Sequence, residues 1–271
     1  MTSQLLTYSA LLRQSGLERS DALALFAHAS GKNHAWLIAH DRDEADPQLA
    51  AAFSELAARR HAGEPVAYLT GRREFFGRDF RVSPAVLIPR PETELLVELA
   101  LARAPRQAQV LDLGCGSGCI PVTLKLERPD LALTAVDISA EALAVATDNA
   151  RQLGAEVRFV ESDWLAALAG EMFDLIVSNP PYIEQHDPHL QQGDLRFEPR
   201  GALTDHCDGL SHLRTIVAGA RAHLISGGWL LFEHGWDQGA ASRELLQAAG
   251  YQDVQSWRDL AGHERISGGV R

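Results

Sequence analysis

Apolar residues in the first seventy positions recur at the spacing typical of α-helices. One helix is expected to begin after a cap at Asp46 and to carry Leu49 and Phe53 on a single face. Ser20 is the expected cap of an earlier helix. Faces of this kind pack into a core more often than around a ligand, so the pattern predicts a small helical bundle over residues 1–71.

The pattern changes over residues 72–90. Two short β-prone runs lie there, one around Gly77 and one around Ser83-Pro84, and predict an extended or β-hairpin connector. Pro91 is expected to open the next helix, because proline is preset for the first helical turn. Glu92 and Glu94 also favour a helix that starts at Pro91, since acidic side chains in the first turn stabilise the positive end of the helix dipole.

From residue 91 to residue 271, β-prone runs alternate with helical segments, one of which is expected between the cap Ser139 and Gly154. This alternation predicts an α/β fold, with a mainly parallel sheet that helices cover on both faces. Ligands of such sheets bind beyond the carboxyl ends of the strands. The expected strands are 109–114, 133–138, 157–162, 173–179, 228–233, 253–259 and 264–270.

Composition narrows the class of protein and of partner. The 271 residues are 46% hydrophobic and 23% charged, without a run of eighteen apolar residues or a signal peptide, so a cytoplasmic protein is expected. Cys115, Cys119 and Cys207 lack metal-site spacing, and we expect free thiols and no metal. A net charge of −11 argues against a protein that grips nucleic acid, and favours a small ligand or a basic protein partner.

A glycine-rich loop follows the first expected strand. It contains Gly114, Cys115, Gly116, Ser117 and Gly118, with glycine at alternate positions. Glycine lets the chain turn tightly and lets a ligand approach bare backbone. The pattern is G-x-G-x-G and not the dinucleotide fingerprint G-x-G-x-x-G. Placed between a strand and a helix, it predicts the binding of a nucleotide-like ligand.

Acidic and aromatic residues follow the next two strands. Asp137 lies nineteen residues after Gly118, the distance at which an acidic residue in such folds meets ribose hydroxyls; its alternative role is a helix cap. Asp163 could accept a hydrogen bond from an exocyclic amine, while the ring of Trp164 lies on the base. This pair predicts an adenine site, with core packing as the alternative for Trp164.

The fourth of these strands ends at Asn179-Pro180-Pro181-Tyr182. Each proline fixes φ and removes an N–H group, so the segment is a stiff turn with few donors. An ordinary loop is the alternative interpretation. Because the carboxyl ends of parallel strands meet at one edge of a sheet, four consecutive strand ends are expected to bring these motifs to one crevice.

Together these motifs resemble the S-adenosylmethionine-dependent methyltransferases of Rossmann-like fold. DLGCGSG is similar to their first motif, and NPPY to the signature of those that methylate an amide or amino nitrogen. The segments GRREFFGRDFRV, VLIPRPETE, RFEPRGAL, FEHGWDQG and RDLAGHERI extend the likeness over nearly the whole chain. In this detail the chain resembles the peptide chain release factor N5-glutamine methyltransferases.

The resemblance implies a seven-stranded Rossmann-like domain, the cofactor S-adenosylmethionine, and methylation of the glutamine in the Gly-Gly-Gln loop of release factors. The N-terminal bundle would help to dock that protein substrate, and Asn179 would also lie near the cofactor. We expect the Asn179 side-chain oxygen and the Pro180 carbonyl to accept the two amide hydrogens. Pro181 would help to preset the turn, and Tyr182 would pack against the carboxamide. Direct binding of nucleic acid or of a membrane is not expected.

Two other functions stay open from the sequence. A DNA or RNA amino-group methyltransferase would use the same Asn-Pro-Pro-Tyr turn on a flipped base. A non-catalytic nucleotide-binding module would need only the glycine loop and the ribose acid. Five residues are left without an assigned role: Phe75, Phe76, Arg90, Glu233 and His234.

Overall fold

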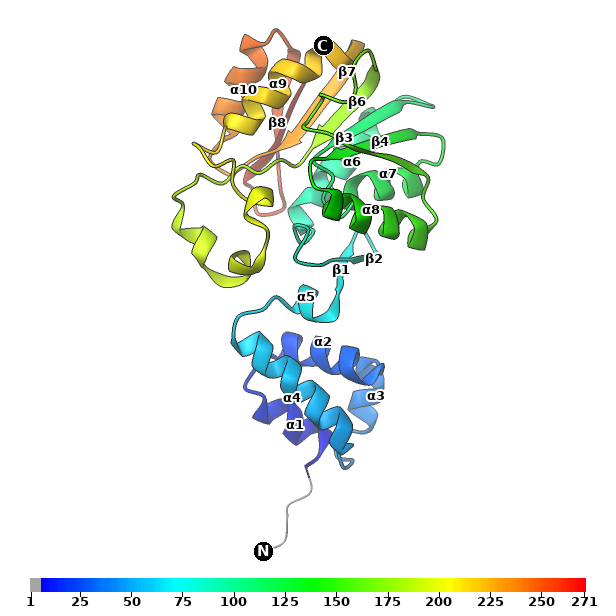
Figure 1. The fold of residues 1–271 in the computed structure, drawn as a ribbon, viewed down its shortest axis with the longest axis vertical. Helices are drawn as coiled ribbons and strands as arrows, with labels where there is room; N and C mark the ends of the chain where they lie inside the picture. Colours follow the sequence, from blue (N-terminus) through cyan, green and yellow to red (C-terminus); the bar gives the residue numbers. More distant parts are fainter. Residues whose placement is uncertain (1–5) are drawn as a thin grey trace, which may run out of the picture. The chain divides into compact units, whose positions relative to one another are not determined.

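The structure, a computed structural model, describes residues 6–271, and it divides into two compact units, Met1–Arg72 and Arg73–Arg271 (Figure 1). The first five residues of the predicted bundle lie outside the described residues. Within residues 6–271, none of the helices combines the length and the apolar character that a membrane crossing requires.

The first unit is helical, as expected. Asp46 caps α4, accepting hydrogen bonds of 2.9 Å from the backbone N–H groups of Gln48 and Leu49. Phe53 of α4 packs edge-on against the ring of Phe26 in α2, and both are almost fully buried. The helices are α1 (Tyr8–Gln14), α2 (Arg19–Ser30), α3 (His34–Ala39), α4 (Pro47–His61) and α5 (Val66–Thr70).

The predicted cap at Ser20 is wrong. Helix α2 begins at Arg19, and Glu18 occupies the N-cap position without a side-chain cap hydrogen bond. The carbonyl of Glu18 already accepts from the N–H of Ala22, so the first turn runs from Glu18 to Ala22 and includes Ser20. Ser20 therefore lies inside the helix, where its hydroxyl cannot cap the first turn.

A two-stranded hairpin, β1 (Arg72–Phe75) and β2 (Arg78–Arg81), confirms the predicted hairpin. Both of its strands flank Gly77, and the second predicted run, around Ser83-Pro84, forms no strand. Phe76 and Gly77 form its two-residue turn with φ of +52° and +74°, the backbone of a type I′ turn. The Asn149 side chain bonds both the N–H and the carbonyl of Arg81, at 2.7 and 3.0 Å, and the carbonyl of Ser117 at 2.9 Å. It thereby fixes the hairpin against the glycine loop.

The described residues also form a seven-stranded sheet of order β5-β4-β3-β6-β7-β9-β8, which confirms the predicted fold class. Pairs from β5 to β7 are parallel, and β9 runs antiparallel to β7 and β8. Strand β3 lies between β4 and β6, so the strand order reverses there and leaves a crevice beyond the carboxyl end of β3. The strands are β3 (Gln109–Leu113), β4 (Ala132–Asp137), β5 (Val157–Glu161), β6 (Phe173–Ser178), β7 (Leu224–Glu233), β8 (Gln252–Arg258) and β9 (Glu264–Val270).

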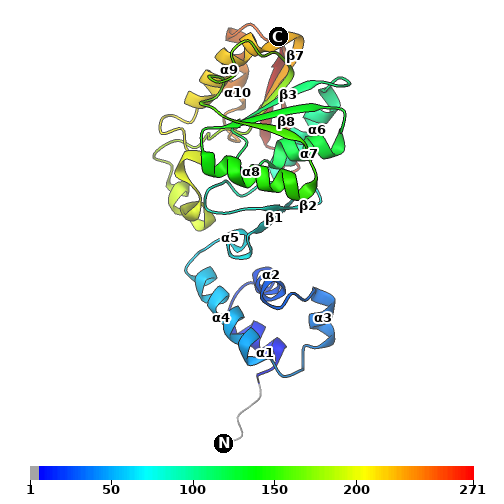
Figure 2. The same ribbon diagram turned by 45° about the vertical axis from the view of Figure 1, so that its right-hand side comes forward.

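Helices cover both faces of this sheet (Figures 1 and 2). Along β3, Val110 points into the core that α6, α7 and α8 cover, whereas Leu111 and Leu113 point into the core under α9 and α10. Pro91 opens a single 3₁₀ turn, η1 (Pro91–Thr93), rather than the α-helix itself. The α-helices are α6 (Glu94–Arg103), α7 (Cys119–Glu127), α8 (Ala140–Leu153), α9 (Ser211–His223) and α10 (Gly239–Ala248).

Helix α8 confirms both of its predicted ends. Ser139 caps it by accepting from the N–H of Ala142, and Gly154 ends it with φ of +75°. The long segment between β6 and α9 contains only short 3₁₀ turns, namely η2 (Pro188–Gln191), η3 (Gly193–Phe197) and η4 (Arg200–Ala202). This segment passes over the carboxyl edge of the sheet, where it forms part of the wall of the site.

Candidate cofactor and substrate site

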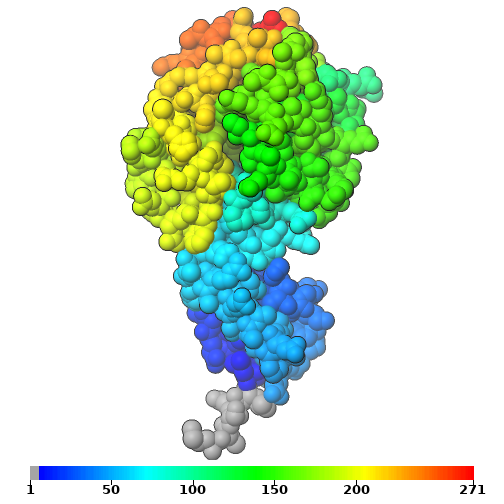
Figure 3. Space-filling model, viewed as in Figure 1, coloured from blue at the N-terminus to red at the C-terminus, as the bar shows by residue number. Residues whose placement is uncertain are grey.

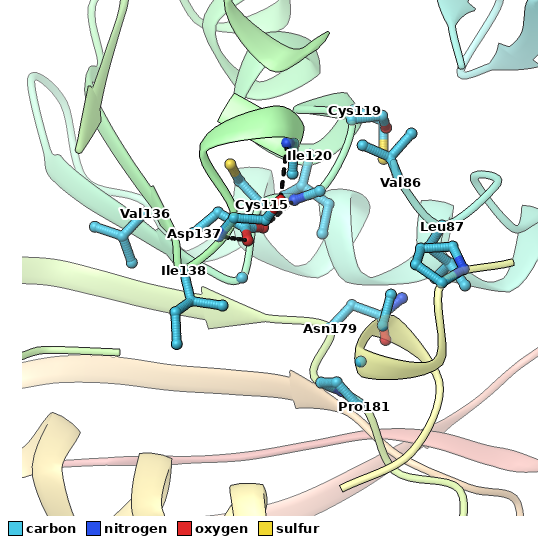
Figure 4. A pocket seen from close by; sticks show the side chains of 18 of the residues that line it. Val86, Leu87, Cys115, Cys119, Ile120, Val136, Asp137, Ile138, Asn179 and Pro181 are labelled. Carbon is cyan, nitrogen blue, oxygen red and sulfur yellow. Dashed lines mark hydrogen bonds between the residues drawn. The ribbon is translucent and has the colours of Figure 1, made fainter. Parts of the chain in front are cut away.

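A cavity of about 290 Å³ lies beyond the carboxyl ends of β3, β4, β5 and β6. The molecular surface is hollowed where its green and yellow regions meet (Figure 3). Nine of the residues predicted for the site line this cavity: Gly114, Cys115, Gly116, Ser117, Asp137, Asp163, Trp164, Asn179 and Pro181. Gly118, Pro180 and Tyr182 are absent from its lining. Figure 4 shows that Asp137 approaches the opening from one segment, and Asn179 and Pro181 approach it from another.

The glycines of the loop have different tasks. Gly114 has φ of +74°, and a Cβ atom there would lie 3.5 Å from the Trp164 ring. Gly118, with φ of +77°, instead faces α8, and its Cβ would lie 3.0 Å from the Cβ of Ala146. Gly114 therefore supplies the left-handed backbone that the turn requires, whereas Gly118 also lets α7 begin close against α8.

The Asp137 carboxylate is fixed by two backbone donors. Its oxygens accept from the N–H of Gly116 at 2.8 Å and from the N–H of Ser139 at 2.9 Å. Ser139 caps α8, so Asp137 is not needed as the side-chain cap. The carboxylate is held at the mouth of the cavity beside Ile138, whose surface is 70% exposed. An acidic group and an apolar surface thus lie next to each other.

Trp164 both lines the cavity and packs in part against the core. Its ring centroid lies 5.1 Å from that of His212, the second residue of α9, which also lines the cavity. Partial burial lowers the pKa of His212, so its imidazole is neutral at pH 7. Sequence reasoning missed His212, because a lone histidine at the start of a helix carries no pattern. Asp163 is exposed at the cavity wall.

Asn179 is held by Thr93. The Asn179 Nδ2 group donates to Thr93 Oγ1 at 3.0 Å, and Thr93 Oγ1 donates to Glu233 Oε2 at 2.7 Å. Among residues 6–271 we find no donor to Asn179 Oδ1 or to the Pro180 carbonyl oxygen. The Asn179 amide therefore has a satisfied nitrogen end and an oxygen free to accept from a ligand.

Glu233 connects the two ends of this turn. It ends β7 and is 1% exposed, and its Oε1 accepts from the Tyr182 hydroxyl at 3.1 Å. Burial raises the pKa of Glu233 to about 7, although the hydrogen bonds from Thr93 and Tyr182 lower it. Burial also raises the pKa of Tyr182, so its hydroxyl stays protonated. The Tyr182 hydroxyl is thus committed to Glu233 and does not face the cavity.

Two loops over the cavity are joined by Glu198. Its carboxylate accepts from the N–H of Ile88 at 3.0 Å and from the Arg90 guanidinium at 2.5 Å. Arg90 lines the cavity, so this residue has a place in the site wall. Phe75 is buried in the core, and Phe76 binds Glu94 through its backbone N–H, so neither faces the cavity.

A buried carboxylate, Asp112, lies two residues before the glycine loop. Neither of its side-chain oxygens has a hydrogen-bond partner within the described part of the chain. Burial, and then the charge of Asp137, raise the pKa of Asp112 well above its usual value. A buried carboxylate of this kind fits a site that receives a positively charged ligand. Sequence reasoning missed it, because its strand is simply apolar on either side.

The thiols of Cys115 and Cys119 are buried, and burial raises the pKa of each. Neither is therefore a reactive thiolate at neutral pH. His189 pairs with Asp187 at 2.7 Å, outside the cavity. In the part of the chain that the structure describes, no three His, Cys, Asp or Glu side chains are grouped as metal ligands would be.

Comparisons with known proteins agree with this geometry. The family model "Methyltransferase small domain" matches residues 91–194, and the model "PrmC N-terminal domain" matches residues 4–71. The chain is 57% identical to the release factor glutamine methyltransferase of Bordetella pertussis, over 96% of this chain and 97% of that protein. It belongs to the release factor glutamine methyltransferase family.

Another member of this family has a similar identity, and a more distant structure shares the fold. The release factor glutamine methyltransferase of Burkholderia pseudomallei is 56% identical, over 97% of this chain and 95% of that protein. The solved structure of a methyltransferase from Pyrococcus furiosus has a TM-score of 0.55 at 19% identity, and covers 79% of this chain and 96% of its own. This structural likeness supports the methyltransferase fold alone.

Proposed function

We propose that this protein transfers a methyl group from S-adenosylmethionine to the side-chain amide nitrogen (N5) of the glutamine in the Gly-Gly-Gln motif of peptide chain release factors. The observation that carries the proposal is the orientation of Asn179, whose free Oδ1 faces the cavity that also holds Asp137 and the glycine loop. Family membership supports the same activity. Methylation of this kind would modulate translation termination.

The residues of the cavity fit the cofactor. Gly114, Cys115, Gly116 and Ser117 line the cavity and offer bare backbone to a ligand. The buried Asp112 carboxyl group, two residues before them in sequence, has no hydrogen-bond partner in the described residues, and a positively charged ligand nearby would favour its ionised form. When bound, S-adenosylmethionine supplies an electrophilic methyl group on a positively charged sulfur. Gly118 contributes indirectly, by setting the start of α7.

Asp137 would accept the two hydroxyls of the ribose. Its carboxylate is already oriented by Gly116 and Ser139, and each oxygen keeps lone pairs for a further donor. A carboxylate there also disfavours a phosphate by like-charge repulsion, which selects a nucleoside over a nucleotide phosphate. Asp163 would accept from the adenine amine, and Trp164 would contact the base.

An amide nitrogen is a poor nucleophile, because its lone pair is delocalised into the carbonyl group. Asn179 Oδ1 would accept one hydrogen of the substrate amide, and the Pro180 carbonyl would accept the other. Holding both hydrogens would aim the face of the nitrogen at the methyl donor. Orientation of this kind can supply roughly 7 to 11 kcal/mol of a reaction barrier.

The two prolines suit this task for a physical reason. Pro180 and Pro181 contribute no N–H group, so this part of the turn presents acceptors to a nitrogen that must itself donate. Pro181 lines the cavity beside Asn179. Tyr182 would hold the far end of the turn through its bond to Glu233, and its ring would border the carboxamide slot.

Binding of the protein substrate would involve the N-terminal helices, residues 1–71. The net charge of −11 complements the basic surface expected of a release factor that reaches ribosomal RNA. The same charge disfavours direct binding of nucleic acid. A substrate of the translation apparatus would place this protein in the cytoplasm.

Mass spectrometry of a release factor incubated with the protein and S-adenosylmethionine tests the proposal. We expect a gain of one methyl group on the glutamine of the Gly-Gly-Gln loop. Parallel reactions with DNA and RNA are expected to incorporate no methyl group. Methylation of nucleic acid without methylation of the release factor would contradict the proposal.

A further inference from the structure

Glu233 is the only described residue that bonds, directly or through one hydroxyl, both ends of the Asn179–Tyr182 turn. It accepts from Thr93 at 2.7 Å and from Tyr182 at 3.1 Å, and Thr93 accepts from Asn179 at 3.0 Å. Glu233 is 1% and Thr93 is 2% exposed, so the bond between them is buried, whereas the bonds of Asn179 and Tyr182 are partly buried. The carboxylate thus lies behind the turn, outside the lining of the cavity.

The charge on Glu233 determines which atom donates in each hydrogen bond of Thr93. An ionised carboxylate has no proton to donate, so the Thr93 hydroxyl must give its proton to Glu233. The Thr93 oxygen then has only lone pairs left for Asn179, and only Nδ2 can satisfy them. The opposite end of the amide, Oδ1, is consequently left as the acceptor that faces the cavity.

A neutral group at this position would remove that constraint. A protonated carboxyl, or the amide of glutamine, can donate to Thr93 and release the Thr93 proton toward Asn179. The Asn179 amide could then turn over and accept from Thr93 through Oδ1. Its NH₂ group would then face the NH₂ group of the substrate amide, and two donors cannot form a hydrogen bond with each other.

We propose that Glu233 is a positioning residue whose ionised carboxylate, acting through Thr93, holds the Asn179 amide with Oδ1 toward the substrate carboxamide. This inference rests on the proposed function, because it assigns Asn179 Oδ1 as the acceptor for the substrate. Glu233 touches neither substrate nor cofactor, and it acts only by setting which end of the Asn179 amide is presented.

The groups around Glu233 determine how its charge depends on pH. Burial raises its pKa to about 7, while Thr93, Tyr182 and the charge of Arg265 in β9 lower it, and Glu92 in η1 raises it. Burial, with a smaller contribution from the charge of Glu233, raises the pKa of the Cys119 thiol in α7 to about 12. Below about pH 7 Glu233 gains a proton, so the correctly oriented fraction of Asn179 falls.

Methyl transfer to a release factor should be measured for Glu233→Gln, Thr93→Val and Thr93→Ser across pH 6 to 9, beside the binding of S-adenosylmethionine by calorimetry. We expect Glu233→Gln and Thr93→Val to lower kcat by up to about 100-fold, with little change in cofactor affinity, and Thr93→Ser to retain the rate. The wild-type rate should rise through about pH 7, and this rise should be absent in Glu233→Gln. The matched control is Ser267→Ala, which removes the buried hydrogen bond that the Ser267 hydroxyl donates to His234 Nε2, and it should keep the wild-type profile.

A second readout does not depend on activity. The side-chain NH₂ signals of Asn179 in ¹⁵N-labelled protein should shift with a midpoint near pH 7 in the wild type and not in Glu233→Gln. If the wild-type protein does not methylate release factors, the proposed function is refuted. The pH dependence of the Asn179 NH₂ signals would still test the role of Glu233. Full activity of Glu233→Gln with an unchanged pH profile, or pH-independent Asn179 signals in the wild type, would overturn the inference.

Discussion

The Ser178 hydroxyl donates a hydrogen bond of 2.7 Å to the carbonyl of Leu113, a residue 65 positions earlier in the chain. The two residues are also register partners on the parallel strands β3 and β6. Gly114 and Asn179 follow them directly, so the glycine loop and the Asn-Pro-Pro-Tyr turn leave the sheet side by side. This pairing brings the predicted cofactor loop and the predicted substrate turn to one cavity.

Replacing Ser178 with alanine should weaken this junction. Both atoms of the bond are buried, so the substitution leaves the Leu113 carbonyl without one of its partners. We expect a loss of roughly 1 to 3 kcal/mol in the free energy of unfolding, measured by urea denaturation. Thr215→Ala, which removes an exposed hydroxyl of α9, is the control and should change stability little. Equal stability of Ser178→Ala and wild type would contradict this role.

Asp137→Asn should weaken cofactor binding specifically. The asparagine keeps the size of the side chain but loses the charge and one acceptor, which is worth about 1.5 to 3 kcal/mol for a charged hydrogen bond. Calorimetry should therefore show roughly a 10- to 100-fold weaker affinity for S-adenosylmethionine. Asp148→Asn, an exposed acid on α8, is the control. If both variants bind S-adenosylmethionine with similar affinity, Asp137 does not bind the cofactor.

Asp112→Asn should stabilise the protein without cofactor at high pH. Burial raises the pKa of Asp112 in the folded state above its unfolded value, so the folded state prefers the protonated form. Its contribution to stability is present at low pH and is lost as the pH rises through the folded pKa. Asparagine mimics the protonated acid, so its advantage over the wild type should grow with pH. Urea denaturation at pH 5 and pH 8 measures this, and a constant difference would contradict the assignment.

Deletion of residues 1–70 should affect the protein substrate far more than the cofactor. The remaining unit retains the whole seven-stranded sheet and the cavity. We expect the KM for the release factor to rise strongly, while the affinity for S-adenosylmethionine changes little. Steady-state kinetics and calorimetry separate the two effects. An unchanged KM for the release factor would show that the bundle does not help to bind the protein substrate.

The sheet could be predicted closely from the sequence, because its buried strands are continuous β-prone runs that end in glycine, acidic residues or proline. Strand β9 was predicted at residues 264–270, as observed, and β6 within one residue of its end. Strand β7 begins at Leu224 rather than at Gly228, because Leu224 pairs with Phe173 of β6. The register between the two strands shifts after this pair, and the glycines in this part of β7 gave no β-prone pattern in the sequence.

The contacts between loops around the site could not be predicted from the sequence in the same way. Thr93 and Glu233 are 140 residues apart, and Arg90 and Glu198 are 108 apart, so each pair meets only once the loops have folded. No periodicity marks a residue whose partner lies on another loop. Asp112 and His212 were missed for other reasons, because Asp112 lies in an otherwise apolar strand and His212 is a lone histidine at the start of a helix.

The most direct test of the account is single-turnover methylation of a release factor by Asn179→Ala, with cofactor affinity measured on the same protein. Loss of the acceptor that orients the substrate amide should lower the rate by at least about 100-fold. Affinity for S-adenosylmethionine should stay within about threefold, because Asp137 and the glycine loop are intact. A variant that retains its rate, or that loses rate and cofactor affinity equally, would contradict the assignment of Asn179 as the residue that holds the amide.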